Sequence, residues 1–125
     1  MSGDPAERFV RAIAERDRLP LQALLSPDVN FRGLTPGRYW EAGSPAEVAE
    51  ILFDHWFEET DHIEAITRLE RGEDLADVKR VGYRFDVTND SGPQVVEQQA
   101  YYRVSAGRLS YLRILCSGFR PRPSS

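Results

Sequence analysis

Cysteine, lysine and long hydrophobic runs are nearly absent from this chain. Cys116 is the only cysteine among 125 residues, which excludes an internal disulfide framework and fits a reducing compartment. No apolar run approaches the roughly 20 residues that cross a bilayer. The N-terminus has no charged segment followed by an apolar stretch, so no signal peptide is visible. We therefore expect a cytoplasmic protein that does not bind membranes.

The chain also lacks an excess of positive charge. Its 20 acidic and 16 basic residues are scattered in both signs and give a net charge of −4. A surface that binds nucleic acid needs a basic patch to neutralise phosphates, so nucleic acid is not an expected partner. What remains is an ordinary globular composition, with 41% hydrophobic and 29% charged residues, at a length typical of one domain.

Two predicted helices start with one pattern: a capping side chain, then a proline, then a glutamate three residues after the cap. The two segments are Asp4-Pro5-Ala6-Glu7 and Ser44-Pro45-Ala46-Glu47. The cap accepts from a free backbone N–H, proline fits the first helical position, and the glutamate reaches back to the cap. Apolar residues at helical spacing extend these starts to helices over 5–17 and 45–59. Leucines between them predict a short second helix over 21–25, ended by Ser26-Pro27.

After Thr60 the hydrophobic period changes from 3.6 to 2, which indicates strands. Turn signals rich in Asn, Asp, Ser, Gly and Pro separate these segments. The predicted strands are 62–69, 78–88, 94–105 and 108–119, with an earlier strand at 28–33, a loop at 34–43 and a disordered tail at 120–125. Helices first and strands later indicate an α+β protein, whose helices cover one face of a mostly antiparallel sheet. No linker or repeat divides the chain, so one domain is predicted over 1–119.

With this order of elements the chain resembles the nuclear transport factor 2-like superfamily, in particular its SnoaL-like branch of small bacterial proteins. The resemblance covers about residues 5–119, and rests on the segment at 25–31 (LSPDVNF) and on the closing strand pair at 101–109 and 112–116. It implies a cystatin-like fold, in which a curved sheet forms a cone around the N-terminal helices and the third helix. The open end of the cone would be a ligand pocket, and the outer sheet face would form a homodimer.

The resemblance also bears on one activity. Ketosteroid isomerases of this superfamily use an aspartate base near the end of the first strand and a protonated acid in a later strand. Laid over this chain without gaps, those positions fall near Gly33 and Ala100. Neither side chain can exchange a proton, so steroid-type isomerase chemistry is disfavoured.

Strand alternation in the same overlay divides the last two long strands between an inner and an outer face. The inner set is Val96, Gln98, Ala100, Tyr102, Val104, Leu112, Ile114 and Cys116. The outer set is Glu97, Gln99, Tyr101, Arg103, Tyr111, Arg113 and Leu115. Tyrosine and arginine are enriched in protein interfaces, so the outer set predicts the homodimer surface.

Two residues are predicted to carry catalysis. His55, on the third helix, is a candidate general base because histidine titrates close to neutral pH, and Tyr102 would orient a carbonyl or hydroxyl group beside it. The alternatives are a helix histidine bonded to a carbonyl and an ordinary core tyrosine.

Five further residues are predicted to contact a ligand: Tyr39, Trp40, Tyr83, Gln98 and Cys116. Tyr39 and Trp40 would close over the pocket as a lid, or else Trp40 would anchor its loop on the core. Cys116 is a weak nucleophile candidate, with an inert buried thiol as the alternative.

These features predict a small-molecule-binding SnoaL-like protein with an apolar pocket, acting as an isomerase, cyclase or hydratase on an apolar carbonyl compound. A non-catalytic dimeric binding or interaction module is the alternative. No cofactor is expected. No metal is expected either, because Asp54-His55 and Asp61-His62 would share a helix face only if the helix continued past Thr60.

Overall fold

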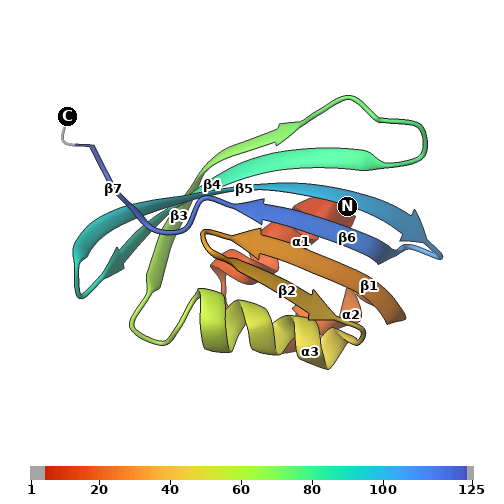
Figure 1. Cartoon of the computed structure of the whole chain (residues 1–125), viewed down its shortest axis with the longest axis horizontal. Coiled ribbons are helices and arrows are strands. Elements are labelled where there is room, and N and C mark those ends of the chain that lie inside the picture. Colours follow the sequence, from red (N-terminus) through yellow and green to blue (C-terminus); the bar gives the residue numbers. More distant parts are fainter. Residues whose placement is uncertain (1–4, 124–125) are drawn as a thin grey trace.

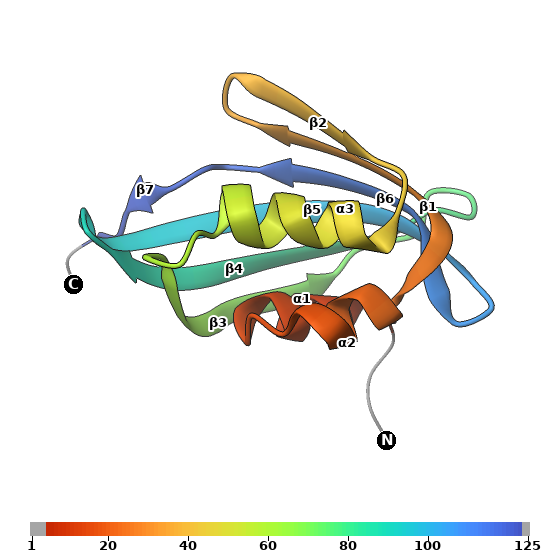
Figure 2. The same ribbon diagram turned by 90° about the horizontal axis from the view of Figure 1, so that it is seen from below.

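The structure, a computed structural model, describes residues 5–123, in which a curved sheet wraps around the helices (Figures 1 and 2). The helical elements are α1 (Pro5–Ala14), α2 (Arg18–Ala23), α3 (Pro45–Glu50) and the π-helix η1 (Ile51–Trp56). The strands are β1 (Leu25–Thr35), β2 (Arg38–Ala42), β3 (His62–Arg71), β4 (Lys79–Asn89), β5 (Gly92–Ser105), β6 (Arg108–Cys116) and β7 (Arg120–Pro121). The predicted α+β class is therefore confirmed.

The described strands form a seven-stranded sheet in the order β2-β1-β6-β5-β4-β3, with β7 paired to β5. Only β1 and β6 run parallel among the pairs in this part of the chain, and the other pairs are antiparallel. The parallel pair brings the first strand of the chain beside its last long strand. Figure 2 shows the helices inside the curve of this sheet.

The core lies between the concave face of the sheet and the helices. Alternate residues of β4, from Val81 to Val87, are at most 2% exposed, as a strand with one buried face requires. Phe9 and Ile13 of α1 are buried to the same degree on the helix side. Burying apolar surface stabilises a fold by roughly 25 cal/mol per Å², so this layer supplies most of the favourable free energy.

The third helix begins as predicted and ends earlier. Ser44 Oγ accepts from the N–H of Glu47 (3.3 Å) and donates to the Glu47 carboxylate (3.2 Å), which also accepts from the N–H of Gly43 (3.1 Å). The α-helix then widens into η1, where the N–H of Phe57 reaches back five residues to the Leu52 carbonyl (2.8 Å). The wider turn lets Leu52, Phe53 and Trp56 all be buried, and the helix stops at Trp56 rather than Glu59.

The N-terminal helices also differ from the prediction. The first helix ends at Ala14, three residues early, and its proposed cap, Asp4, lies outside the described residues. The second helix begins at Arg18 and contains Pro20, because the first turn of a helix does not need every backbone N–H. Residues 25–27 were predicted to end this helix but belong to β1, where Leu25 pairs with Leu109.

The predicted loop at 34–43 is wrong, because this segment forms a β-hairpin. Thr35 pairs with Arg38 across the turn residues Pro36 and Gly37. Gly37 has a φ of +78°, and proline followed by glycine with positive φ is the pattern of a type II turn. The hairpin places β2 on the edge of the sheet beside η1.

The C-terminal segment is more ordered than predicted. The last long strand ends at Cys116, three residues before the predicted Phe119. Residues 117–119 then leave the ladder, and Arg120 and Pro121 pair again with β5. Arg122 donates to the carbonyl of Val87 (3.0 Å) and pairs with Glu64 (3.0 Å). A disordered tail is therefore wrong for 120–122, and residues 124–125 lie outside the described part.

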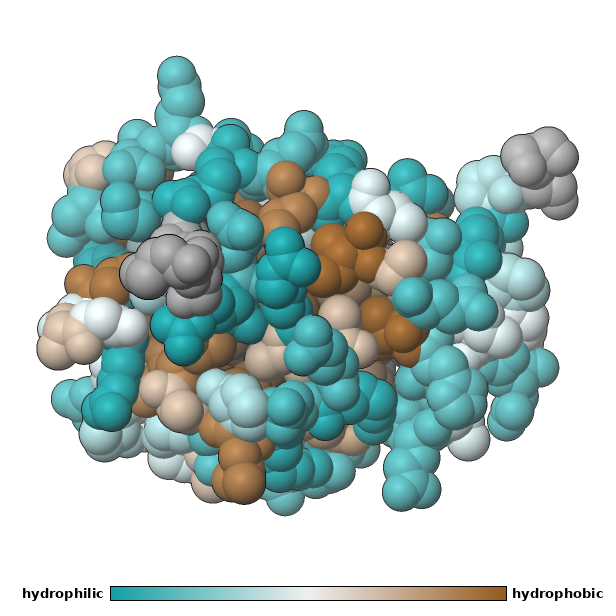
Figure 3. Space-filling view, turned by 180° about the vertical axis from the view of Figure 1, so that it is seen from behind, coloured by the Kyte–Doolittle hydropathy of each residue, from teal (hydrophilic) through white to brown (hydrophobic). Residues whose placement is uncertain are grey.

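On the side turned away in Figure 1, the surface is mostly hydrophilic, with smaller hydrophobic areas near its centre (Figure 3). Within residues 5–123, no helix is long and apolar enough to cross a membrane.

Candidate functional site

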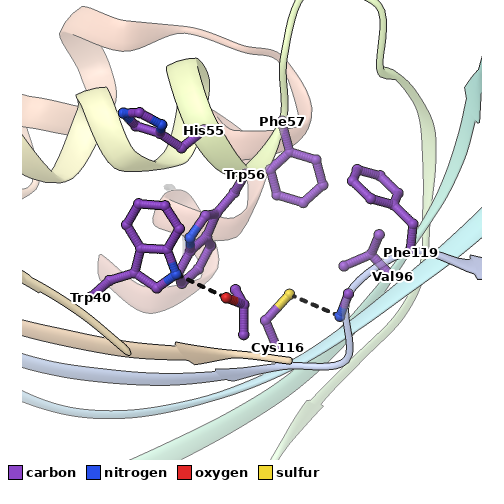
Figure 4. Close-up of a pocket in the computed structure, with 9 residues that line it drawn as sticks. Trp40, His55, Trp56, Phe57, Val96, Cys116 and Phe119 are labelled. Carbon is purple, nitrogen blue, oxygen red and sulfur yellow. Dashed lines mark hydrogen bonds between the residues drawn. The ribbon is translucent and has the colours of Figure 1, made fainter. Parts of the chain in front are cut away.

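A pocket of about 170 Å³ opens where the end of η1 faces the hairpin and the end of β6 (Figure 4). Its lining is almost entirely apolar and mostly aromatic. The lining residues are Thr35, Trp40, His55, Trp56, Phe57, Val96, Cys116, Gly118 and Phe119.

The aromatic side chains of the wall form two nearly perpendicular pairs. The rings of Trp40 and Trp56 meet at 79° with centroids 6.3 Å apart. Those of Phe57 and Phe119 meet at 83° with centroids 6.0 Å apart. Figure 4 shows the two tryptophans on one side and the two phenylalanines on the other, with Val96 next to Phe119 and Cys116 between the two sides.

The interruption between β6 and β7 builds one side of the pocket. Ser117 makes two hydrogen bonds with the backbone of Glu97. The N–H of Ser117 donates to the Glu97 carbonyl, and Ser117 Oγ accepts from the Glu97 N–H, both at 2.9 Å. Gly118 follows with a φ of +73°, a conformation that favours glycine. The reversal brings Phe119 against Phe57 before the chain rejoins β5.

Behind this wall runs a short chain of buried hydrogen bonds. Tyr83 donates its hydroxyl to Gln98 Oε1 (2.6 Å), and Gln98 donates through Nε2 to Cys116 Sγ (3.3 Å). The N–H of Gly118 reaches the same sulfur (3.4 Å). Burial raises the pKa of the Cys116 thiol, although these two donors oppose the shift, and burial raises the pKa of Tyr83 well above its ordinary value. Cys116 therefore faces the pocket as a neutral thiol at pH 7.

Trp40 is a wall of the pocket rather than a loop residue that closes over it. Its indole N–H donates to Thr35 Oγ1 (2.8 Å) across the hairpin, and the ring lies 5.3 Å from that of His55. The Arg38 guanidinium stacks on the same indole, with its carbon 3.7 Å from the ring centroid. Tyr39, its neighbour on β2, points to the opposite face of the sheet and bonds Glu41 (2.9 Å). The predicted lid is therefore wrong in two respects. The segment is a β-hairpin rather than a loop, and Tyr39 does not line the pocket.

The two residues predicted to act together in catalysis are not brought together. His55 lines the pocket at its rim and is exposed. Tyr102 is buried in the core and does not line this pocket. It lies four residues beyond Gln98 on β5, which is about 13 Å along an extended strand.

The predicted inner face is otherwise correct in most positions. Six of its eight members are buried, and Cys116 is half-buried at the pocket. Val104 is the exception, with 38% of its surface exposed, although its partner across the ladder, Leu109, is buried.

Gly33 has a role that the sequence alone did not reveal. A Cβ atom at this position would lie 2.7 Å from the Trp56 indole, which therefore packs directly on the glycine backbone. In the overlay with ketosteroid isomerases, this is the place expected for the aspartate base. In this protein the position is a glycine with the Trp56 indole packed on it. No carboxylate is among the residues that line the pocket.

Sequence reasoning missed Thr35, Trp56, Phe57, Val96, Gly118 and Phe119 as pocket residues. Val96 was assigned to the correct inner face, but nothing marked it as lining a cavity. The signal for Gly118 and Phe119 was the glycine itself, which breaks the alternation of the last strand.

Metal binding has no support in the described residues, where no three His, Cys, Asp or Glu side chains gather closely enough to hold an ion. Asp61 caps the turn instead, accepting from the N–H of Glu58 (2.9 Å) and from the Asn89 amide (3.0 Å). Asp54 pairs with Arg18 (3.1 Å).

No protein-family model matches the sequence, and no curated protein matches it. Solved structures resemble it in fold. A ketosteroid isomerase-like protein from Erwinia carotovora atroseptica is 23% identical, covers 94% of this chain and 92% of its own, and gives a TM-score of 0.67. A proposed polyketide cyclase from Xanthomonas campestris is 16% identical. The match covers 89% of this chain and 86% of the cyclase chain, with a TM-score of 0.66.

A protein of ketosteroid isomerase-like fold from Catenulispora acidiphila, solved in complex with trimethylamine, is 13% identical. The match covers 94% of this chain and 88% of that protein's chain, with a TM-score of 0.67. The chain therefore has the ketosteroid isomerase-like fold of the nuclear transport factor 2-like proteins, which confirms the resemblance drawn from its order of elements. At these identities the likeness establishes the fold and leaves the activity to the residues of the site.

Proposed function

We propose that this protein binds a small, largely apolar molecule in the pocket between η1, β2 and the end of β6. The observation that carries the proposal is the aromatic wall around a cavity of about 170 Å³. An apolar cavity of about 150 Å³ in another protein holds benzene, so this one has room for a ligand about the size of a single ring. Trimethylamine, bound by one structural neighbour, is within that size.

The size also limits the class of ligand. Pockets that enclose drug-sized molecules measure roughly 300–1,000 Å³, which is well above this volume. A steroid or a polyketide intermediate would therefore place only one group in the pocket and leave the rest outside. This supports a small ligand more than the substrates after which the neighbours are named.

Tryptophan fluorescence tests the proposal, because Trp40 and Trp56 are the chain's two tryptophans and both line the pocket. Saturable quenching or a spectral shift on titration with toluene is the expected result, and Val96→Phe, which narrows the cavity without adding an indole, should weaken it. Native mass spectrometry of freshly purified protein would identify a retained ligand. Absence of any saturable change in the folded wild type contradicts the proposal.

Isomerase or cyclase chemistry is a second candidate, favoured by the names of the neighbours and by the position of His55. His55 is the one imidazole in the pocket wall and touches the Trp40 ring, so it can reach a bound carbon acid or water. General-base help contributes roughly 10²–10⁴-fold in rate. If an activity is found, His55→Gln should lower kcat by that factor while the fold is retained. Unchanged turnover in this variant would show that His55 is not the general base.

A further inference from the structure

The rings around the pocket have a consequence for the charge of the ligand. Four aromatic side chains, Trp40, Trp56, Phe57 and Phe119, stand as two nearly perpendicular pairs on opposite sides of the cavity. An aromatic ring carries negative potential on its faces and positive potential at its edge. Because the members of each pair are turned by about a right angle, the faces of the four rings around the cavity point in more than one direction.

We propose that this pocket recognises a methylated ammonium group, such as the trimethylammonium end of a small cation. The inference rests on the proposed function, since it names the ligand class for the same pocket. A cation over a tryptophan face is attracted by the ring quadrupole, and aromatic cages of this kind recognise quaternary ammonium groups.

The polar atoms of the wall favour a methylated ammonium over a primary one. Thr35 Oγ1 already accepts from the Trp40 indole (2.8 Å), and Cys116 Sγ accepts from Gln98 and from Gly118. A primary ammonium has three N–H donors, whereas the acceptors it would find in this wall are the second lone pair of Thr35 Oγ1 and the imidazole of His55 at the rim, so it would lose its water for fewer hydrogen bonds. A trimethylammonium group has no N–H donor, and its methyl groups suit an apolar wall.

A buried donor in the wall without a hydrogen-bond partner does not oppose this arrangement. The indole N–H of Trp56 is buried and has no hydrogen-bond acceptor. In Figure 4 its nitrogen lies beside the Trp40 ring rather than toward the two phenylalanines. It therefore meets an aromatic neighbour and not the centre of the cavity.

Arg38 shows that the Trp40 ring already attracts a cation. Its guanidinium carbon lies 3.7 Å from the ring centroid, although the side chain is exposed and does not line the pocket. A second cation inside the pocket would be repelled weakly by this charge. The arrangement thus predicts that removing the Arg38 charge strengthens cation binding in the pocket.

The test compares two probes of the same shape, choline and its neutral isostere 3,3-dimethylbutan-1-ol, by calorimetry and tryptophan fluorescence. Choline should bind about tenfold more tightly than the alcohol, since cation–π attraction in a desolvated site reaches about that factor. This comparison uses the wild-type protein alone, so it does not depend on whether a variant folds.

Variants locate the preference in the rings. Trp40→Leu and Phe119→Leu keep an apolar wall but remove a ring, and each should weaken choline binding about fivefold to tenfold while changing the alcohol far less. Tyr39→Leu is the matched control, because Tyr39 is the adjacent aromatic residue on β2 and faces the other way. It should change neither affinity. Arg38→Gln should tighten choline binding and leave the alcohol unchanged.

The outcomes separate this inference from the proposed function. Equal binding of the two probes, or tighter binding of the alcohol, overturns the ammonium inference and leaves an apolar binding pocket. Failure of choline, the alcohol and toluene alike to bind overturns both. Loss of choline binding in Tyr39→Leu but not in Trp40→Leu would place cation binding outside this pocket and overturn the inference.

Discussion

The contact between Gly33 and Trp56 decides the shape of the pocket at the scale of single residues. Gly33 sits on β1 with the indole directly over its backbone, and a Cβ atom there would lie 2.7 Å from two ring carbons. Real Cβ atoms do not approach that closely, so a larger residue must move the indole. Moving Trp56 also disturbs its contacts with Phe31 and Trp40.

Gly33→Ala should therefore destabilise the protein by about 1–3 kcal/mol and alter the tryptophan fluorescence, as overpacked core positions do. Urea denaturation measures the first effect and emission spectra the second. Gly82→Ala is the matched control on β4, because its Cβ would meet only the flexible Gln99 amide at 3.6 Å. Gly82→Ala should be neutral or slightly stabilising. Equal loss of stability in both variants would mean that the Trp56 contact is not the cause.

The buried pair of Tyr83 and Cys116 gives the stability a pH dependence of known sign. Burial raises the pKa of Cys116 above 9.0 and that of Tyr83 well above 10.0, their ordinary values. When the pH rises past those ordinary values, the unfolded chain loses these protons and the folded protein keeps them. Unfolding then releases protons, so the free energy of unfolding falls as the pH rises.

We expect stability to decrease from about pH 9 upward, and to decrease less steeply in Tyr83→Phe, which has no phenol to ionise. Urea denaturation at a series of pH values gives the slope. The readout is the change in slope, because Tyr83→Phe also removes the hydrogen bond to Gln98 and so lowers stability at every pH. An identical slope in the two proteins would contradict the assignment to Tyr83.

Single residues also show how far the sequence predicts the site. Among the residues predicted for the site, Trp40, His55 and Cys116 line the pocket, and Gln98 and Tyr83 form the layer behind it; their roles toward a ligand stay predictions. Tyr102 was predicted from strand alternation, which gives the correct face but not the position along the cone. Phe119 was not predicted, because its place depends on the interruption of the ladder at 117–119, which Gly118 signals but whose effect on the path of the chain hydrophobic alternation does not give.

At the scale of elements, local signals predict the starts of helices better than their ends. The sequence Ser-Pro-Ala-Glu at 44–47 predicts a capping box, and Ser44 Oγ does accept from the Glu47 N–H, while the Glu47 carboxylate accepts from Ser44 Oγ and from the N–H of Gly43, one residue before the cap. The end of the same helix depends on tertiary packing, since the π-turns of η1 are shaped by burial of its large side chains. The hairpin at β1–β2 was missed because its Pro-Gly turn was taken as part of an irregular loop.

Ser44→Ala should cost about 1 kcal/mol, the usual effect of losing a helix cap. Ser44→Asp retains an acceptor for the Glu47 N–H and should cost less, although its charge lies beside the Glu47 carboxylate. Thermal unfolding followed by circular dichroism measures both. Because α3 leads directly into η1 and the pocket, fluorescence should report a looser Trp56 environment in Ser44→Ala. Unchanged stability in that variant would show that the helix start is held by packing alone.

At the scale of the whole molecule, the outer face of the sheet is the largest feature without an assigned partner. No described helix covers it, in agreement with the views in Figures 1 and 2. Leu34, Tyr39 and Leu115 lie together on it around a shallow apolar hollow, and each is between 47% and 51% exposed. Beside them Arg103 and Arg113 stack on the Tyr111 ring, at 4.5 and 4.0 Å. Aromatic and arginine side chains around an apolar centre are typical of protein interfaces.

We propose that two copies of the chain pair through this face with two-fold symmetry, as symmetric dimers bury the same patch on both partners. Leu115→Asp should then shift the protein from dimer to monomer in light scattering, because it places a charge at the centre of the buried patch. Leu75→Asp is the control, since Leu75 is 75% exposed and lies between β3 and β4, away from this hollow. Both variants should keep the far-ultraviolet circular dichroism of the wild type. A wild-type protein that remains monomeric at high micromolar concentration would contradict the proposal, and so would a Leu115→Asp variant that remains dimeric.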